Sequence, residues 1–162
     1  MQRTLSLPIL AAVVVVGILA TARPARAEVG VGVFVGQPTG LGVKLDLARR
    51  SALDLVVGWD DFDDGRDGYV HVTYLVNLGV ARGRSVLVPF RVGVGGVVYG
   101  GPGDFGDEVN LGVRAPFQLG LRFRRSPVEL YGELALKLTL LDDGRNDDDV
   151  DLDGGVGLRI YF

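Results

Sequence analysis

The sequence predicts an all-β fold, an eight-stranded antiparallel up-and-down transmembrane β-barrel preceded by a cleavable signal peptide. Three observations predict it. Apolar residues alternate with glycine or polar residues in eight successive segments, and the helical period of 3.6 is almost absent. One face of these segments carries large apolar side chains almost without interruption, whereas the other is rich in glycine and holds charges of both signs. Several segments also reach the length of about ten residues that a tilted strand needs to cross a bilayer.

The N-terminal segment 1–27 is predicted to be a signal peptide. Arg3 gives it a short positive region, residues 5–20 are apolar, and Ala25-Arg26-Ala27 supplies the small residues of a cleavage site. A transmembrane anchor is the alternative, but the apolar run is short for one. Cleavage would leave residues 28–162 as the barrel domain. Because three of the 17 basic residues leave with the segment, that domain has 14 basic and 20 acidic side chains.

The acidic balance of the domain disfavours nucleic acid as a partner, since binding to phosphate backbones depends on clustered lysine and arginine. The chain has no cysteine, so no disulfide framework holds it together outside the cytoplasm. No apolar run long enough for a transmembrane helix remains after residue 27. An exported chain that crosses a membrane would therefore have to do so with strands.

The first four alternating segments are predicted strands because their apolar residues share one parity. They span 28–36, 40–48, 52–60 and 69–78. Valine and leucine dominate the apolar parity, which also holds Trp59 and Tyr74. Glycine and a few polar residues occupy the other parity, namely Lys44, Asp46, Asp54, His71, Thr73 and Asn77. Successive side chains of a strand point to opposite faces, so each segment has one apolar and one polar face.

The last four segments follow the same rule. They span 86–99, 109–123, 128–140 and 151–162. The parity becomes irregular at Gly95-Gly96, where we expect a β-bulge. The last segment alternates up to Phe162, the final residue. The polar parity of these segments holds Arg91, Asn110, Arg114, Gln118, Arg122, Glu129, Tyr131, Glu133, Lys137, Thr139, Asp151, Asp153, Arg159 and Tyr161.

The connections differ between the two ends of the strands. Short basic turns occur at 48–51, 81–84 and 124–127, whereas longer, acidic, glycine-rich loops occur at 60–68, 100–108 and 142–149. Segment 36–40 is a tight Pro/Gly turn. Bacterial outer-membrane barrels have short periplasmic turns and long external loops. The basic turns are therefore predicted to be periplasmic and the acidic loops external, and the protein is predicted to reside in the bacterial outer membrane.

Aromatic residues near the strand ends agree with this placement. Trp59, Tyr69, Tyr99 and Phe105 fall near the predicted outer ends, and Phe123 and Phe162 fall near the periplasmic ends. Aromatic girdles occupy these depths in outer-membrane barrels. A soluble periplasmic barrel or lipocalin-like binder is the alternative, in which the apolar parity would face a core.

The charged residues of the polar parity are predicted to form an interior network. An eight-stranded barrel is just wide enough to be filled by side chains. A buried charge needs a partner, and the set holds six basic and five acidic residues, which predicts packed ion pairs rather than an open pore. The set comprises Lys44, Asp46, Asp54, Arg91, Arg114, Arg122, Glu129, Glu133, Lys137, Asp153 and Arg159.

The whole segment 28–162 resembles the small eight-stranded outer-membrane barrels of the OmpX and OmpA-transmembrane-domain type. GQPTGLGVKLDL (36–47), ALDLVVGW (52–59) and DGGVGLRIYF (153–162) resemble, more narrowly, a family of such barrels in spirochaetes and related bacteria. That family has no established catalytic residues to carry over. The ending Ile160-Tyr161-Phe162 is similar to the C-terminal signal that barrel-assembly machinery recognises, which implies this machinery as a partner.

No constellation of residues predicts an enzyme. The glycine-rich stretches lack the lysine and the strand–loop–helix context of nucleotide-binding loops. His71 is the one histidine and is predicted to point inward, away from any lipid substrate, whereas Ser51, Ser85 and Ser126 fall at the basic turns. A carboxylate acid–base pair, Glu129 with Glu133, stays open as an alternative, although their salt-bridge surroundings favour a structural role.

An acidic motif resembles the start of a calcium-binding loop. Asp149, Asp151 and Asp153 form D-x-D-x-D-G, but Ile160 stands where an EF-hand needs its glutamate. These residues are weak candidates for a loosely bound divalent cation, and no other cofactor is expected. The acidic loops could also bridge through divalent cations to lipopolysaccharide or bind a basic external protein.

The sequence therefore predicts a non-catalytic outer-membrane barrel with a structural or surface-interaction role, in contact with outer-membrane lipid and lipopolysaccharide. A narrow channel for small solutes is one alternative, and a lipid-modifying barrel enzyme is another.

Overall fold

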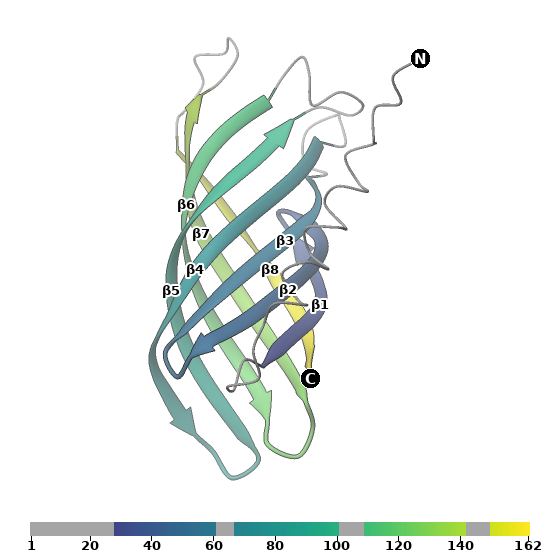
Figure 1. Cartoon of the computed structure of the whole chain (residues 1–162), viewed down its shortest axis with the longest axis vertical. Helices are drawn as coiled ribbons and strands as arrows, with labels where there is room; N and C mark the ends of the chain where they lie inside the picture. Colours follow the sequence, from purple (N-terminus) through teal and green to yellow (C-terminus); the bar gives the residue numbers. More distant parts are fainter. Residues whose placement is uncertain (1–27, 61–66, 101–108, 142–149) are drawn as a thin grey trace.

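The strands of the protein form one closed antiparallel barrel. The computed structural model describes residues 28–60, 67–100, 109–141 and 150–162, so the predicted signal peptide lies outside the described residues. Within these residues the barrel order is β1 to β8, each strand pairs with its sequence neighbours, and β8 pairs with β1 (Figure 1). The strands are β1 (Val29–Gly36), β2 (Thr39–Ala48), β3 (Ser51–Asp60), β4 (Asp67–Arg82), β5 (Val86–Gly100), β6 (Val109–Phe123), β7 (Val128–Leu141) and β8 (Val150–Tyr161). The predicted all-β, eight-stranded, antiparallel up-and-down barrel is confirmed.

The prediction of strand bounds was least accurate for β4. This strand continues to Arg82, beyond the predicted end at residue 78. Its register with β5 shifts between Asn77 and Gly79, so Leu78 is an extra residue that lets the strand continue after the bulge. No helix among the described residues is long and apolar enough to cross a membrane.

The β-bulge expected at Gly95-Gly96 is absent from the described pairing of β4 and β5, so that prediction was wrong. Gly95 pairs with Thr73 and Gly96 pairs with Val72 without a break. The misleading signal came from Val97, an apolar residue that faces the interior and is buried. An apolar side chain on the inner parity imitates a change of parity in the sequence.

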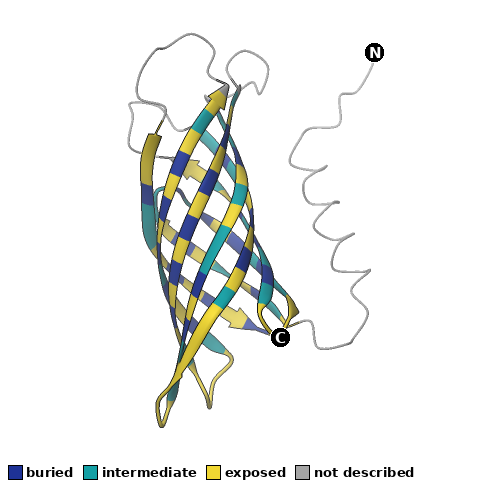
Figure 2. Ribbon diagram, turned by 90° about the vertical axis from the view of Figure 1, so that its left-hand side faces the viewer, coloured by how far each residue is buried: buried dark blue, intermediate teal, exposed yellow. Residues whose placement is uncertain are grey.

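Away from the turns, the charged side chains of the strands point into the barrel and most of the large apolar side chains point outward. Buried and exposed residues alternate along the strands (Figure 2). Leu41, Leu134 and Val156 are exposed on the outer face, whereas Lys44, Gln118 and Arg159 are buried. This is the reverse of a soluble domain, in which charged side chains are almost never fully buried unless paired.

Inward-facing glycines let the strands β1, β2, β3 and β8 approach closely on the concave side. A Cβ atom at Gly32 would overlap the carbonyl oxygen of Leu158 on β8, and one at Gly58 would overlap that of Thr39 on β2. Gly36, at the end of β1, also has a positive φ of 150°. The wall that closes the barrel therefore depends on the absence of side chains at these positions.

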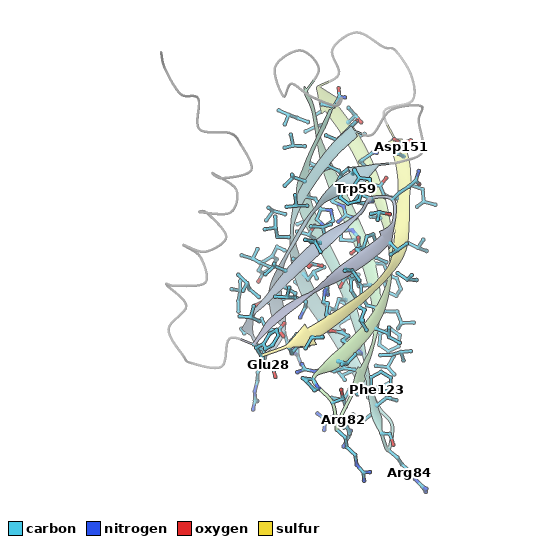
Figure 3. The ribbon with its side chains drawn as sticks, turned by 90° about the vertical axis from the view of Figure 1, so that its right-hand side faces the viewer. Glu28, Trp59, Arg82, Arg84, Phe123 and Asp151 are labelled. Carbon is cyan, nitrogen blue, oxygen red and sulfur yellow. The ribbon has the colours of Figure 1, made fainter. Side chains whose placement is uncertain are left out.

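The two ends of the barrel carry different residues. Figure 3 shows Glu28, Arg82, Arg84 and Phe123 at the end that holds the C-terminus, and Trp59 and Asp151 towards the other. The turns between β2 and β3, β4 and β5, and β6 and β7 lie at the first end. Most of each acidic connection, together with Phe105, lies outside the described residues.

Candidate functional site

Charged side chains from six strands converge inside the barrel. We call this set the polar column, and it consists of Lys44 and Asp46 on β2, Asp54 on β3, Arg91 on β5, Arg114, Gln118 and Arg122 on β6, Glu129, Glu133 and Lys137 on β7, and Asp153 and Arg159 on β8. The column follows from the period of two, since these residues share the inward parity of their strands. We divide the column into three levels along the barrel axis. Strand β7 contributes one residue to each level: Glu129 to the first, Glu133 to the second and Lys137 to the third.

The first level lies near the basic turns and is centred on Glu129. Glu129 is fully buried and lies 2.6 Å from Nη1 of Arg91, and it accepts a hydrogen bond from the hydroxyl of Tyr161. The guanidinium of Arg122 stacks 4.2 Å above the Tyr161 ring and donates to Glu28 over 2.8 Å. That hydrogen bond lowers the pKa of the Glu28 carboxyl.

Lys44 joins the same level from β2. Its ammonium pairs with Asp46 on the same strand and lies 5.4 Å from the centre of the Tyr161 ring. A recess of about 570 Å³ opens beside these groups towards the basic end, and Asn77 and Arg91 contribute to its lining. Paired side chains thus fill the barrel at the first level, and the recess beside them opens at the basic end.

The second level links β3, β6, β7 and β8 through one chain of contacts. Asp54 accepts hydrogen bonds from Nη2 of Arg159 over 2.5 Å and from Nε2 of Gln118 over 2.8 Å. Gln118 donates its other amide proton to Glu133 over 2.5 Å, and Arg114 pairs with Glu133 at 2.5 Å. The neutral amide separates the two carboxylates, and each carboxylate has its own arginine. This level therefore balances two positive and two negative charges.

The third level lies near the acidic end. The ammonium of Lys137 is 3.4 Å from Asp153 and 3.2 Å from Asp151, and it lies 4.8 Å from the centre of the Tyr99 ring. The hydroxyl of Tyr69 donates to Asp153 over 2.9 Å.

These contacts bear on the predicted cation site. Asp149 lies outside the described residues, and the ammonium of Lys137 pairs with both Asp151 and Asp153. In the part of the chain that the structure describes, no group of three His, Cys, Asp or Glu residues could hold a metal ion. The calcium-like spacing of the sequence thus corresponds to a strand whose inward carboxylates bind a lysine.

His71 is buried beside the second level. Its two ring nitrogens lie 3.0 Å and 2.9 Å from Nη1 of Arg114, and its ring packs against that of Tyr69 in a T-shaped arrangement. Ser51 and Ser85 lie in or beside the basic turns, away from this level. Glu129 and Glu133 are each held by a different arginine, Arg91 and Arg114, rather than by each other. The arrangement thus places His71 against Arg114, which itself pairs with Glu133.

Sequence reasoning placed these residues on the inner face but did not identify Gln118 and the tyrosines as connecting groups. Tyr131 stacks on the guanidinium of Arg159 at 3.7 Å, and the Tyr161 ring contacts both Arg122 and Lys44. Their inward parity was the available signal, because a large polar side chain on the inner parity of a small barrel must contact the charges around it.

The fold is similar to one solved structure, the N-terminal β-barrel domain of OprF from Pseudomonas aeruginosa. The TM-score is 0.54 at 14% sequence identity, and the match covers 84% of this chain and 96% of that domain. No protein-family model and no curated protein matches the chain. At this identity the similarity concerns the fold, and it confirms the predicted likeness to the small eight-stranded barrels.

Proposed function

We propose that the protein is a non-catalytic β-barrel of the bacterial outer membrane with a structural or surface-interaction role. One observation carries the proposal: the closed barrel has an apolar outer face, and the charged residues of the polar column lie inside it. A bilayer offers no water to backbone groups, so strands can cross it only in a barrel without free edges.

The size of the apolar outer face supports the proposal. Large apolar side chains from all eight strands are exposed in the described residues, whereas soluble monomers rarely expose large contiguous apolar patches. Trp59 is exposed near one end of this belt, and Phe123 and Phe162 are exposed near the other. Aromatic residues at both ends of an apolar belt are typical of the two bilayer interfaces.

The polar column favours a structural barrel over a channel or an enzyme. Each of its charged groups has a partner of opposite charge, and a conducting path would have to separate several of these pairs. His71 contacts Arg114 rather than a nucleophile, which argues against hydrolysis of a lipid substrate.

The environment follows from the same proposal. The predicted signal peptide and the C-terminal residues Ile160, Tyr161 and Phe162 would direct the chain to export and to the barrel-assembly machinery. The acidic loops would face outward, where loosely bound divalent cations could bridge them to lipopolysaccharide or where a basic external protein could bind them.

Replacing Leu134 with arginine tests the contact with lipid. Leu134 is 59% exposed, lies in the middle of β7, and pairs with Phe117 and Gly154. Arginine at the midplane of a bilayer is expected to cost about 2–4 kcal/mol. Denaturant unfolding of the barrel in lipid vesicles, followed by heat-modifiable gel migration, measures this cost.

Leu47→Arg is the matched control. Leu47 is 51% exposed but lies at the end of β2 beside the basic turn, where the same substitution is expected to cost about 0–1 kcal/mol. Equal costs at the two positions, or a mature chain that stays in solution without detergent, would contradict the proposal.

A further inference from the structure

We propose that the basic end of the barrel binds the headgroup phosphates of anionic phospholipids in the adjacent leaflet. This inference rests on the proposed function, because it requires a barrel that spans a bilayer. The sites are the three turns that carry Arg49 and Arg50, Arg82 and Arg84, and Arg124 and Arg125, which we call the arginine rim.

The arginines of the rim are exposed and carry no ionic partner among the described residues. All six side chains are exposed, and within the described ranges no carboxylate lies within 4.0 Å of any of them. The lysines and arginines of the polar column, by contrast, each have an ion-pair partner. The rim therefore presents an uncompensated positive charge.

The rim lies where the apolar belt ends. Phe123 is exposed and directly precedes Arg124, and Leu47 is exposed two residues before Arg49. Figure 3 shows Arg82 and Arg84 beyond Phe123 at the same end. If the belt lies in acyl chains, the guanidinium groups lie at the depth of the headgroups, where charged side chains on long stems are stable.

One recess at the rim has the composition of a headgroup site. Its volume is about 930 Å³, and its lining includes Arg82, Arg122, Arg124 and Arg125 together with Phe123 and Phe162. Glu28, which also lines it, is engaged by Arg122. A guanidinium group can bind two oxygens of one phosphate at once. The aromatic rings favour the interface between acyl chains and headgroups. A zwitterionic headgroup would bring its own cation against the rim, so a lipid of net negative charge fits better.

The charge of the opposite end agrees with this choice. Segments 60–68 and 142–149 each contain five acidic residues and one arginine in the sequence. In the sequence they join β3 to β4 and β7 to β8, and the strand ends that they join lie away from the rim. Anionic lipid would be attracted to one end of the molecule and repelled from the other.

The test compares how strongly spin-labelled phosphatidylglycerol and phosphatidylcholine associate with the barrel in reconstituted vesicles. The wild-type protein is expected to favour phosphatidylglycerol by about threefold or more, and the preference should collapse near 1 M salt. A variant with all six rim arginines replaced by glutamine is expected to show no preference. An all-lysine variant is the matched control. It should keep a preference for phosphatidylglycerol because the charge is kept, but a weaker one than the wild type because an ammonium group cannot bind phosphate bidentately.

Heat-modifiable migration establishes that each variant is folded. If the sixfold glutamine variant does not fold, the double variant Arg124→Gln with Arg125→Gln replaces it in the comparison. Failure of the wild-type protein to enter vesicles of either lipid would refute the proposed function itself. A normal barrel with equal preference in wild type and glutamine variant would refute only this inference. Co-sedimentation with peptidoglycan tests the other possible partner of the rim. If the glutamine variant keeps the lipid preference of the wild type but loses a co-sedimentation with peptidoglycan that the wild type shows, the inference is also refuted, because the rim would then bind the cell wall.

Discussion

Replacing Arg159 with methionine is expected to lower the unfolding free energy of the barrel by about 3–5 kcal/mol. Arg159 is fully buried, lies 2.5 Å from Asp54, and stacks on Tyr131. Methionine fills similar volume but leaves the Asp54 carboxylate with the Gln118 amide as its remaining partner. The cost of an uncompensated charge in a closed interior exceeds the cost of a lost contact.

Denaturant titration in vesicles or micelles measures the effect, and a double-mutant cycle isolates the pair. Asp54→Asn is expected to destabilise for the same reason, whereas the double variant should recover part of the loss, because both charges are then gone. Glu28→Gln breaks a solvent-exposed pair and is the matched control, with an expected cost of about 0–1 kcal/mol. If Arg159→Met costs no more than Glu28→Gln, the polar column does not stabilise the barrel.

Replacing Gly32 with alanine is expected to prevent normal closure of the barrel. Gly32 pairs with Arg159 across the β1–β8 seam, and a Cβ atom there would overlap the carbonyl oxygen of Leu158. Relief requires movement of backbone rather than of a flexible side chain, so the cost is expected to reach the upper part of the usual range of about 1–3 kcal/mol for overpacking. The fraction of chain that reaches the heat-modifiable folded form in detergent is the measurement.

Gly96→Ala makes the same chemical change where the structure predicts no harm. A Cβ atom at Gly96 would have no atom within 4 Å, and the residue faces outward on β5. Its folded fraction is expected to match the wild type within error, since surface substitutions away from special features usually change stability by about 0.5 kcal/mol or less. A Gly32→Ala variant that folds as well as Gly96→Ala would show that the seam tolerates a side chain.

The sequence alone was sufficient to predict the fold because period-two patterns specify which face of each strand is apolar. Seven of the predicted strands agree with the structure to within two residues at each end, and β4 differs because Leu78 forms a bulge. A bulge adds one residue without any special composition, so a parity pattern cannot distinguish it from the end of a strand.

The contacts of the interior were less predictable than its composition. Asp54 and Arg159 are 105 residues apart in the sequence, and their contact depends on the stagger of strands around the barrel. Alternation gives the face of each residue but not its height relative to other strands, so Arg91 with Glu129 and Gln118 with Asp54 could not be assigned as partners. The signal peptide and the cation site at Asp149 remain predictions, since they fall on residues that the structure does not describe.

The depth of a single outward residue tests the central claim most directly. The chain has no cysteine, so a fluorophore can be attached at Leu136→Cys on the outer face of β7, with Arg84→Cys at the basic end as its matched control. Both variants are reconstituted in vesicles whose acyl chains carry a quencher. A bilayer-spanning barrel predicts strong quenching at position 136 and little at position 84. Equally weak quenching at both positions in a folded barrel would show that the apolar face does not contact lipid.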